Sequence, residues 1–260
     1  MKIVVLGAGN VGTQLSRALH EKGLGLCQIY NRHRDRAAAL AAELGCPLTD
    51  DVQCLRQDAD IYVCTLKDDV LDDVLRQIPI FGEGLWVHTS GSLPMTVFAP
   101  YTRHYGVLYP LQTFSRDRAV SFERIPLCLE ASGRQEMQLL KPLACSLSSN
   151  VREMSSDQRA GMHLAAVFAC NFVNACYAVA GDVMQQSELD FELLLPLIEE
   201  TAAKVHRSLP DLAQTGPAVR GDRRIIDRHL SLLESWRQPL WADIYRQLSE
   251  LIYTRHNGQI

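Results

Sequence analysis

The sequence predicts two domains: an α/β domain with a doubly wound, mostly parallel sheet, followed by an all-helical domain. Three observations support this prediction. Short apolar runs alternate with amphipathic helix patterns as far as residue 154, which is typical of parallel βαβ units. A glycine-rich turn joins the first apolar run to the first helix pattern. No convincing strand pattern follows, so we expect one domain over residues 1–154 and a second over 155–260.

The N-terminal residues match the pattern of a dinucleotide-binding turn. The apolar run Ile3–Leu6 is followed by G-A-G-N-V-G, and a helix pattern begins at once. In such a motif the first glycine permits the tight turn, the second lets the backbone approach a pyrophosphate, and the third lets the helix pack on the strand. The helix N-terminus also attracts anions. We therefore predict a Rossmann domain that binds pyrophosphate; the alternative is a turn with a packing role only. The predicted binding residues are Gly7, Gly9, Asn10, Val11 and Gly12.

The end of the second predicted strand, Leu26–Tyr30, indicates which dinucleotide is bound. NAD-specific domains usually place an acidic residue there for the ribose 2′-hydroxyl. This chain instead has Asn31, Arg32 and Arg34, and guanidinium groups suit a 2′-phosphate. The sequence therefore favours NADP over NAD, with a solvated basic turn as the alternative.

Two further strand ends supply polar candidates for the same crevice. The strand Asp60–Thr65 ends in Thr65, with Lys67 close behind, and we expect both to contact the cofactor, although Lys67 could simply be exposed. The strand Leu85–His88 is followed by T-S-G-S, where Ser90 is a candidate for polarising a carbonyl or imine. The alternative role for Ser90 is to cap a helix.

The remaining elements complete the two domains. Further strands are expected at His104–Leu108, Ile125–Glu130 and Asn150–Met154, and further helices at Asp35–Leu44, Asp68–Ile78 and Arg134–Leu147. The helical domain is expected to contain helices at Ser155–Gln186, Phe191–Ser208, Asp222–Glu234 and Pro239–Arg255.

The long helix pattern over Ser155–Gln186 is almost wholly apolar in its second half. It could be mistaken for a membrane span, but a buried helix, placed at a subunit interface, is the prediction favoured by its polar residues. At about 100° per residue, Asn174 lies roughly 20° and Asn171 roughly 80° from His163 around the helix. We expect these three residues on one face, where they contact a ligand or, alternatively, satisfy one another and the backbone in a core.

Composition restricts the class of protein. A net charge of −4 gives no general attraction to nucleic acid or to an anionic membrane. Eight cysteines without a C-x-x-C pair are typical of a reduced cytoplasmic protein, and the sequence predicts no metal site.

Several motifs together resemble one known family. They are G-A-G-N-V-G, Asn31-Arg32, H-T-S-G-S at 88–92, P-L-Q-T-F at 110–114 and the segment Thr215–Asp222. In this order they resemble Rossmann-like NADP oxidoreductases with a C-terminal "domain of unknown function 2520", over essentially the whole chain. The chain is more distantly similar to pyrroline-5-carboxylate reductases, deazaflavin-dependent NADP reductases and β-hydroxyacid dehydrogenases. The resemblance implies a homodimer formed by the helical domain, with the active site in the cleft between domains.

One departure from these relatives concerns the proton donor. β-Hydroxyacid dehydrogenases place a catalytic lysine on the long helix, one turn before an asparagine, whereas Val167 and Cys170 stand at the corresponding positions here. We therefore expect Ser90 and His163 to polarise or protonate the substrate, because an imidazole can act as a general acid near neutral pH.

The resulting hypothesis is an NADP(H)-dependent oxidoreductase that transfers a hydride between the nicotinamide and a small carbonyl or imine compound. Residues expected to orient the substrate are Gln112, Asn171, Asn174 and Arg220. Arg220 could equally pair with Asp222. Two alternatives stay open: a non-catalytic NADP-binding regulatory or redox-sensing dimer, which the missing lysine favours, and an enzyme for which the nucleotide is a substrate or a structural ligand.

Overall fold

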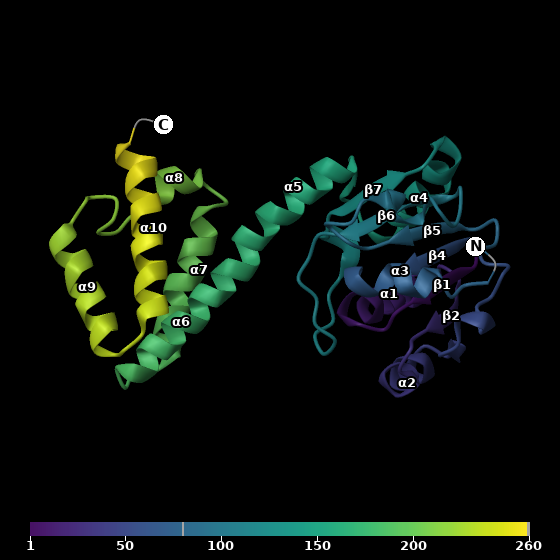
Figure 1. Cartoon of the computed structure of the whole chain (residues 1–260), viewed down its shortest axis with the longest axis horizontal. Helices are drawn as coiled ribbons and strands as arrows, with labels where there is room; N and C mark the ends of the chain where they lie inside the picture. Colours follow the sequence, from purple (N-terminus) through teal and green to yellow (C-terminus); the bar gives the residue numbers. More distant parts are fainter. Residues whose placement is uncertain (80, 259–260) are drawn as a thin grey trace. The chain divides into compact units, whose positions relative to one another are not determined.

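The computed structural model describes residues 1–79 and 81–258. Two compact units form, Met1–Asn171 and Phe172–Ile260. The first is the predicted α/β Rossmann domain with a mostly parallel sheet, and the second is helical (Figure 1). The sheet ends with β8 (Val151–Glu153), whereas the compact units divide further on, within a helix. The boundary at residues 154/155 stays a prediction.

The sheet has the strand order β3-β2-β1-β4-β5-β6-β7-β8, and only the β6–β7 pair is antiparallel. Its strands are β1 (Ile3–Leu6), β2 (Leu26–Tyr30), β3 (Leu48–Thr49), β4 (Ile61–Cys64), β5 (Leu85–His88), β6 (Tyr105–Pro110), β7 (Leu127–Ala131) and β8. The predicted strands are present, and the two-residue edge strand β3 had no sequence signal. The order reverses between β1 and β4, which is where open α/β sheets bind ligands.

Helices and short turns connect the strands. They are α1 (Asn10–Glu21), α2 (Arg34–Glu43), α3 (Asp68–Leu75) and α4 (Arg134–Leu147), with 3₁₀ turns η1 (Val52–Cys54), η2 (Met95–Phe98) and η3 (Phe122–Arg124). The four residues of β1 are fully buried, as expected for a parallel strand covered on both faces.

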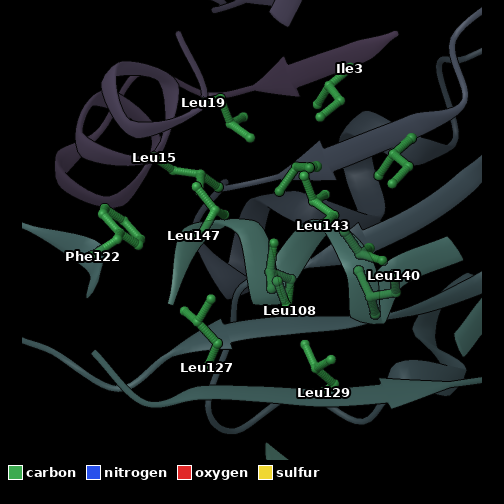
Figure 2. Close-up of a cluster of buried hydrophobic side chains, with 14 of the residues drawn as sticks. Ile3, Leu15, Leu19, Leu108, Phe122, Leu127, Leu129, Leu140, Leu143 and Leu147 are labelled. Atoms are coloured by element: carbon green, nitrogen blue, oxygen red, sulfur yellow. The ribbon is translucent and has the colours of Figure 1, made fainter. Parts of the chain in front are cut away.

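The core on one face of the sheet is a mostly aliphatic layer that also includes Phe122 (Figure 2). Leu15 and Leu19 of α1 and Leu140 and Leu143 of α4 pack there with Leu108 of β6. The opposite face is covered by α3 and η2, where the rings of Tyr62 and Trp86 stack with centroids 4.1 Å apart. Helices on both faces fix the strand ends at which the candidate site lies.

The predicted helix over Ser155–Gln186 is present but is not regular. It consists of α5 (Ser156–Ala166), a π-helical segment η4 (Val167–Phe172) and α6 (Val173–Gln186). Ser155 and Gln158 form a capping box, with the Gln158 N–H donating to Ser155 Oγ at 3.2 Å. The π-helical segment changes the period between His163 and Asn174, so the angles calculated at 100° per residue do not hold across it.

The second unit contains α6 and the remaining helices. These are η5 (Phe191–Leu194), α7 (Leu195–Lys204), α8 (Pro210–Ala213), α9 (Arg223–Ser235) and α10 (Pro239–Asn257). The helix predicted over Phe191–Ser208 is divided into η5 and α7, and α7 ends at Lys204, four residues earlier than predicted.

Apolar side chains of the helical unit are largely exposed within one chain. Among its described residues, the buried hydrophobic ones are Ala218, Leu233 and Ala242, whereas Leu197 and Leu240 are 63% and 66% exposed. The stretch Ser156–Gln186 is long and apolar enough to cross a membrane by length and composition, and its apolar part is not buried within the chain. Burial of this helix at a subunit interface therefore stays a prediction.

Candidate active site

The glycine turn after β1 is closely packed except at its second glycine. Gly7 has φ +108°, a conformation that favours glycine, and a Cβ on Gly12 would lie 2.1 Å from the Gly7 carbonyl oxygen. A Cβ on Gly9 would meet no atom within 4 Å. Packing therefore requires glycine at positions 7 and 12, whereas Gly9 leaves open space beside the N-terminus of α1. This is the geometry that a pyrophosphate needs.

Asn31 and Thr65 brace this turn from the neighbouring strands. Asn31 Oδ1 accepts the Ala8 N–H at 3.0 Å, and Thr65 Oγ1 donates to the Gly7 carbonyl at 2.9 Å. Both residues lie where the sequence predicted, at the ends of β2 and β4. Their polar atoms hold the backbone of the glycine turn in place.

The two predicted phosphate-binding arginines differ in their surroundings. Arg34 Nη1 donates to the Leu48 carbonyl at 3.1 Å and lies 3.7 Å from Asp50 Oδ1. Arg32 is exposed, and among the described residues it has no ion pair. It lines a cavity of about 390 Å³, which valines and the carboxylates of Asp50, Asp51 and Asp73 also line. Arg32 is therefore the arginine available to a ligand.

Ser90 organises the loop that follows β5. Its Oγ donates to Asp68 Oδ2 at 2.9 Å and accepts the Leu93 N–H at 3.0 Å. Ser92 Oγ also donates to Asp68 Oδ2, at 2.9 Å. Ser90 therefore holds the loop and does not cap a helix, since the next helix, η2, begins after Pro94 without a side-chain cap. Its hydroxyl proton is already donated to a carboxylate.

His163 of α5 lies against this loop and against β6. Its Nδ1 is 3.1 Å from the hydroxyl of Tyr109, and the two rings meet edge to face at 78°. A Cβ on Gly91 would lie 2.6 Å from His163 Nδ1, so the absence of a side chain there admits the imidazole. Burial raises the pKa of Tyr109, which keeps its phenol protonated and able to donate to His163.

A buried ion pair fixes α5 at this position. Arg159 is 1% exposed; its Nη1 donates to Glu130 Oε2 of β7, and its Nη2 to the Leu93 carbonyl. Ser156 also donates to Glu130, through its N–H at 2.9 Å and its hydroxyl at 2.8 Å. Since Arg159 lies one helical turn before His163, the pair sets where the imidazole lies. Arg159 and Glu130 were not among the residues predicted from the sequence; an arginine one turn before the histidine was the available signal.

His88 is buried beneath the site. Its Nδ1 accepts the Ser90 N–H at 3.1 Å, and its ring lies against Phe98. Burial, with a smaller contribution from the charge of Arg159, lowers the pKa of His88 from 6.5 to about 4. His88 is therefore neutral at physiological pH and acts as an acceptor for the loop.

The other predicted residues are exposed and take no part in the hydrogen bonds described above for the glycine turn, Ser90 and His163. Gln112 Oε1 accepts the Thr113 N–H at 2.8 Å, and Lys67 directly precedes α3. Asn171 lies in the π-helical segment, and Asn174 and Arg220 belong to the helical unit. Arg220 forms no ion pair with Asp222 within the described residues; Asp222 caps α9 instead, accepting the Ile225 N–H at 3.3 Å.

Two family models match the chain. Residues 2–88 match the family "NADP oxidoreductase coenzyme F420-dependent", and residues 125–252 match "Domain of unknown function (DUF2520)". A crystal structure from Bacteroides fragilis, provisionally described as that of an NADP oxidoreductase, is 42% identical; the alignment covers 97% of each chain, with a TM-score of 0.92.

Two more distant proteins share with this chain either the fold alone or a short part of the sequence. An imine reductase of Myxococcus stipitatus, solved in complex with NADP+, has the same fold at 18% identity; the alignment covers 98% of this chain and 92% of that one, with a TM-score of 0.68. A glutamyl-tRNA reductase of Stutzerimonas stutzeri is 36% identical over 83 residues, which are 31% of this chain. The chain matches only 18% of the length of that reductase.

Proposed function

Because the chain belongs to the family of Rossmann-like NADP oxidoreductases with a C-terminal domain of unknown function 2520, we propose that it binds NADP(H) and transfers a hydride between the nicotinamide and a small carbonyl or imine compound. The observation that supports this most directly is the glycine turn. It is closed by packing at Gly7 and Gly12 and open at Gly9, beside the N-terminus of a twelve-residue helix.

The residues present fit the pyrophosphate and the 2′-phosphate of this cofactor. The amides of Asn10 and Val11 lie in the first turn of α1, where N–H groups lack intrahelical acceptors and can bind a pyrophosphate. Arg32, which is not engaged by a carboxylate among the described residues, would bind the 2′-phosphate. Arg34, Thr65 and Lys67 stay predicted contacts. When bound, the nicotinamide supplies or accepts the hydride.

His163 is our proposed proton donor to the substrate heteroatom. A neutral imidazole carries its proton on one nitrogen only. We propose that the protonated phenol of Tyr109 donates to His163 Nδ1, 3.1 Å away, which places the proton of the neutral ring on Nε2. That nitrogen has no hydrogen-bond partner within the described residues and can donate to a carbonyl or imine. Tyr109 acts here as a positioning residue.

Ser90 fits a supporting role. Its proton is already donated to Asp68, so we propose that it orients the substrate while His163 donates the proton. The roles of Gln112, Asn171, Asn174 and Arg220 in orienting the substrate stay predictions.

We also propose a homodimer in the cytoplasm. The exposed apolar residues of the long helix and the helical unit, among them Leu164, Leu197 and Leu240, need a covering that a second copy of the chain would provide. Eight free cysteines fit a reducing compartment. Sedimentation of the detergent-free protein tests the dimer: a soluble monomer would contradict it, and material that requires detergent would favour a membrane location.

Titration of the purified protein with NADPH, NADP, NADH and NAD tests the cofactor. We expect NADPH to bind at least tenfold more tightly than NADH, about 1.4 kcal/mol. Arg32→Ala should remove most of this preference, whereas Arg36→Ala, an exposed arginine in the first turn of α2, is the matched control. Absence of binding by every nucleotide would refute the oxidoreductase.

A screen of small ketones, aldehydes and cyclic imines with NADPH tests the reaction. His163→Gln should lower turnover about 100-fold, the usual effect of losing a general acid, while NADPH affinity changes little. If NADPH binds and no substrate is turned over, or if His163→Gln is fully active, the proton-donor role fails and the non-catalytic alternative is favoured.

A further inference from the structure

A loop that follows β6 is anchored across the first helix. Gln14 of α1 is 2% exposed, and its Nε2 donates to the carbonyls of Ser115, Arg116 and Arg118 at 2.7, 3.1 and 3.0 Å. A buried amide that shares its protons among three carbonyls fixes the backbone of this loop, because leaving it unsatisfied would cost about 1–3 kcal/mol.

A second side chain of α1 holds the same loop. Arg17 Nη1 donates to the Arg116 carbonyl at 3.1 Å, and the rest of its guanidinium binds Glu43 at 2.8 and 2.7 Å. Two side chains of α1, Gln14 and Arg17, therefore fix the backbone from which the Arg116 side chain extends.

The Arg116 side chain extends to the glycine turn. It is half-buried, and its Nη2 donates to the carbonyl of Ala8, the residue between the first two glycines of the motif. Within the part of the chain that the structure describes, Arg116 has no ion pair with a carboxylate. A guanidinium has five N–H donors, so most of its donor capacity and its whole charge remain uncompensated beside the open position of Gly9.

We propose that Arg116 is a further cofactor-binding residue, which binds the pyrophosphate of the dinucleotide over the glycine turn. This inference rests on the proposed function. The N-terminus of α1 supplies only partial positive charge, whereas a guanidinium supplies a full charge and paired donors that match phosphate oxygens. The anchored loop delivers this charge from a segment about 100 residues distant in sequence.

The affinity for NADPH and NADH, measured by nicotinamide fluorescence with the full-length protein, tests the proposal. Arg116→Gln keeps an N–H donor at this position but removes the charge. It should lower the affinities for NADPH and NADH by the same factor of about ten. Arg116→Lys keeps the charge and should stay within about threefold of wild type. Arg118→Gln, in the same loop but exposed, is the matched control and should change neither affinity.

The dependence of affinity on salt separates charge from structure. NADPH binding by the wild type should weaken with sodium chloride more steeply than binding by Arg116→Gln. Salt screens the attraction between the Arg116 charge and the phosphates, and the variant lacks that charge. Equal affinities and equal salt dependence of wild type and Arg116→Gln would overturn the proposal while leaving NADP binding intact. A loss confined to NADPH would also overturn it, since it would place Arg116 at the 2′-phosphate. A wild type that binds no dinucleotide would refute the proposed function as well.

Discussion

Arg159 of α5 and Glu130 of β7 form a buried ion pair that joins the long helix to the sheet. The guanidinium is 1% exposed and also binds the Leu93 carbonyl, so a single side chain connects the helix, the strand and the loop after β5. His163 follows one turn later. The pair therefore determines the geometry of the candidate site without contacting the reacting atoms.

Replacement of Glu130 should strongly destabilise the α/β unit. Glu130→Ala leaves a buried guanidinium uncompensated, and we expect the free energy of unfolding to fall by about 3–5 kcal/mol. Urea denaturation followed by circular dichroism measures this. Glu153→Ala removes the exposed pair with Lys141 and should cost at most about 1 kcal/mol. Similar losses in the two variants would contradict a structural role for the buried pair.

Tyr109→Phe should remove the preference of the neutral His163 ring for one tautomer. Without the phenol donor, the proton of the neutral imidazole is no longer directed to Nε2, and turnover should fall about tenfold at unchanged NADPH affinity. ¹⁵N chemical shifts of the labelled ring should move from one dominant tautomer toward a mixture. Tyr101→Phe, which removes a hydroxyl bonded to Asp72 at 2.7 Å, is the control. Unchanged ring shifts in Tyr109→Phe would contradict the proposed hydrogen-bond direction.

Gly9 and Gly12 should respond differently to the same substitution. Gly9→Ala places a methyl group in open space, so stability should be unchanged while NADPH binds at least tenfold more weakly. Gly12→Ala drives a methyl group into the Gly7 carbonyl and should lower stability by about 1–3 kcal/mol even without nucleotide. Thermal unfolding and NADPH titration of both variants measure this contrast. Normal NADPH affinity in Gly9→Ala would refute the assignment of the open position to the pyrophosphate.

His88 should make stability depend on pH. Its pKa is lowered from 6.5 to about 4 in the folded chain, so the unfolded chain binds more protons between these values. Stability is complete above pH 6.5 and is lost as the pH falls toward 4. Between pH 7.5 and pH 5 the loss attributable to His88 should be about 2 kcal/mol.

His88→Asn isolates this contribution, because Asn retains an acceptor for the Ser90 N–H but does not titrate. Urea denaturation of both proteins at pH 7.5 and pH 5 gives the difference directly. If wild type and variant lose the same free energy of unfolding between pH 7.5 and pH 5, other groups account for the pH dependence.

Local patterns predicted most of the architecture correctly. The apolar run of β1, the glycine turn and the start of the long helix at Ser155 each depend on residues within a few positions of one another. The same local view failed for the π-helical segment Val167–Phe172, since an apolar stretch is compatible with either helical period. It also does not show what covers the exposed apolar surface of the long helix, because burial depends on packing partners distant in sequence or on another chain.

The amino-acid sequence by itself determined the Rossmann domain, the position of its glycine turn and the basic residues at the end of β2. The tertiary structure alone decided which distant residues meet there. Arg159 and Glu130 are separated by 29 positions, His163 and Tyr109 by 54, and Arg116 and Ala8 by 108. The physical reason is that periodicity and turn chemistry arise from neighbouring residues, whereas these contacts depend on the order of strands in the sheet and on the packing of helices against it.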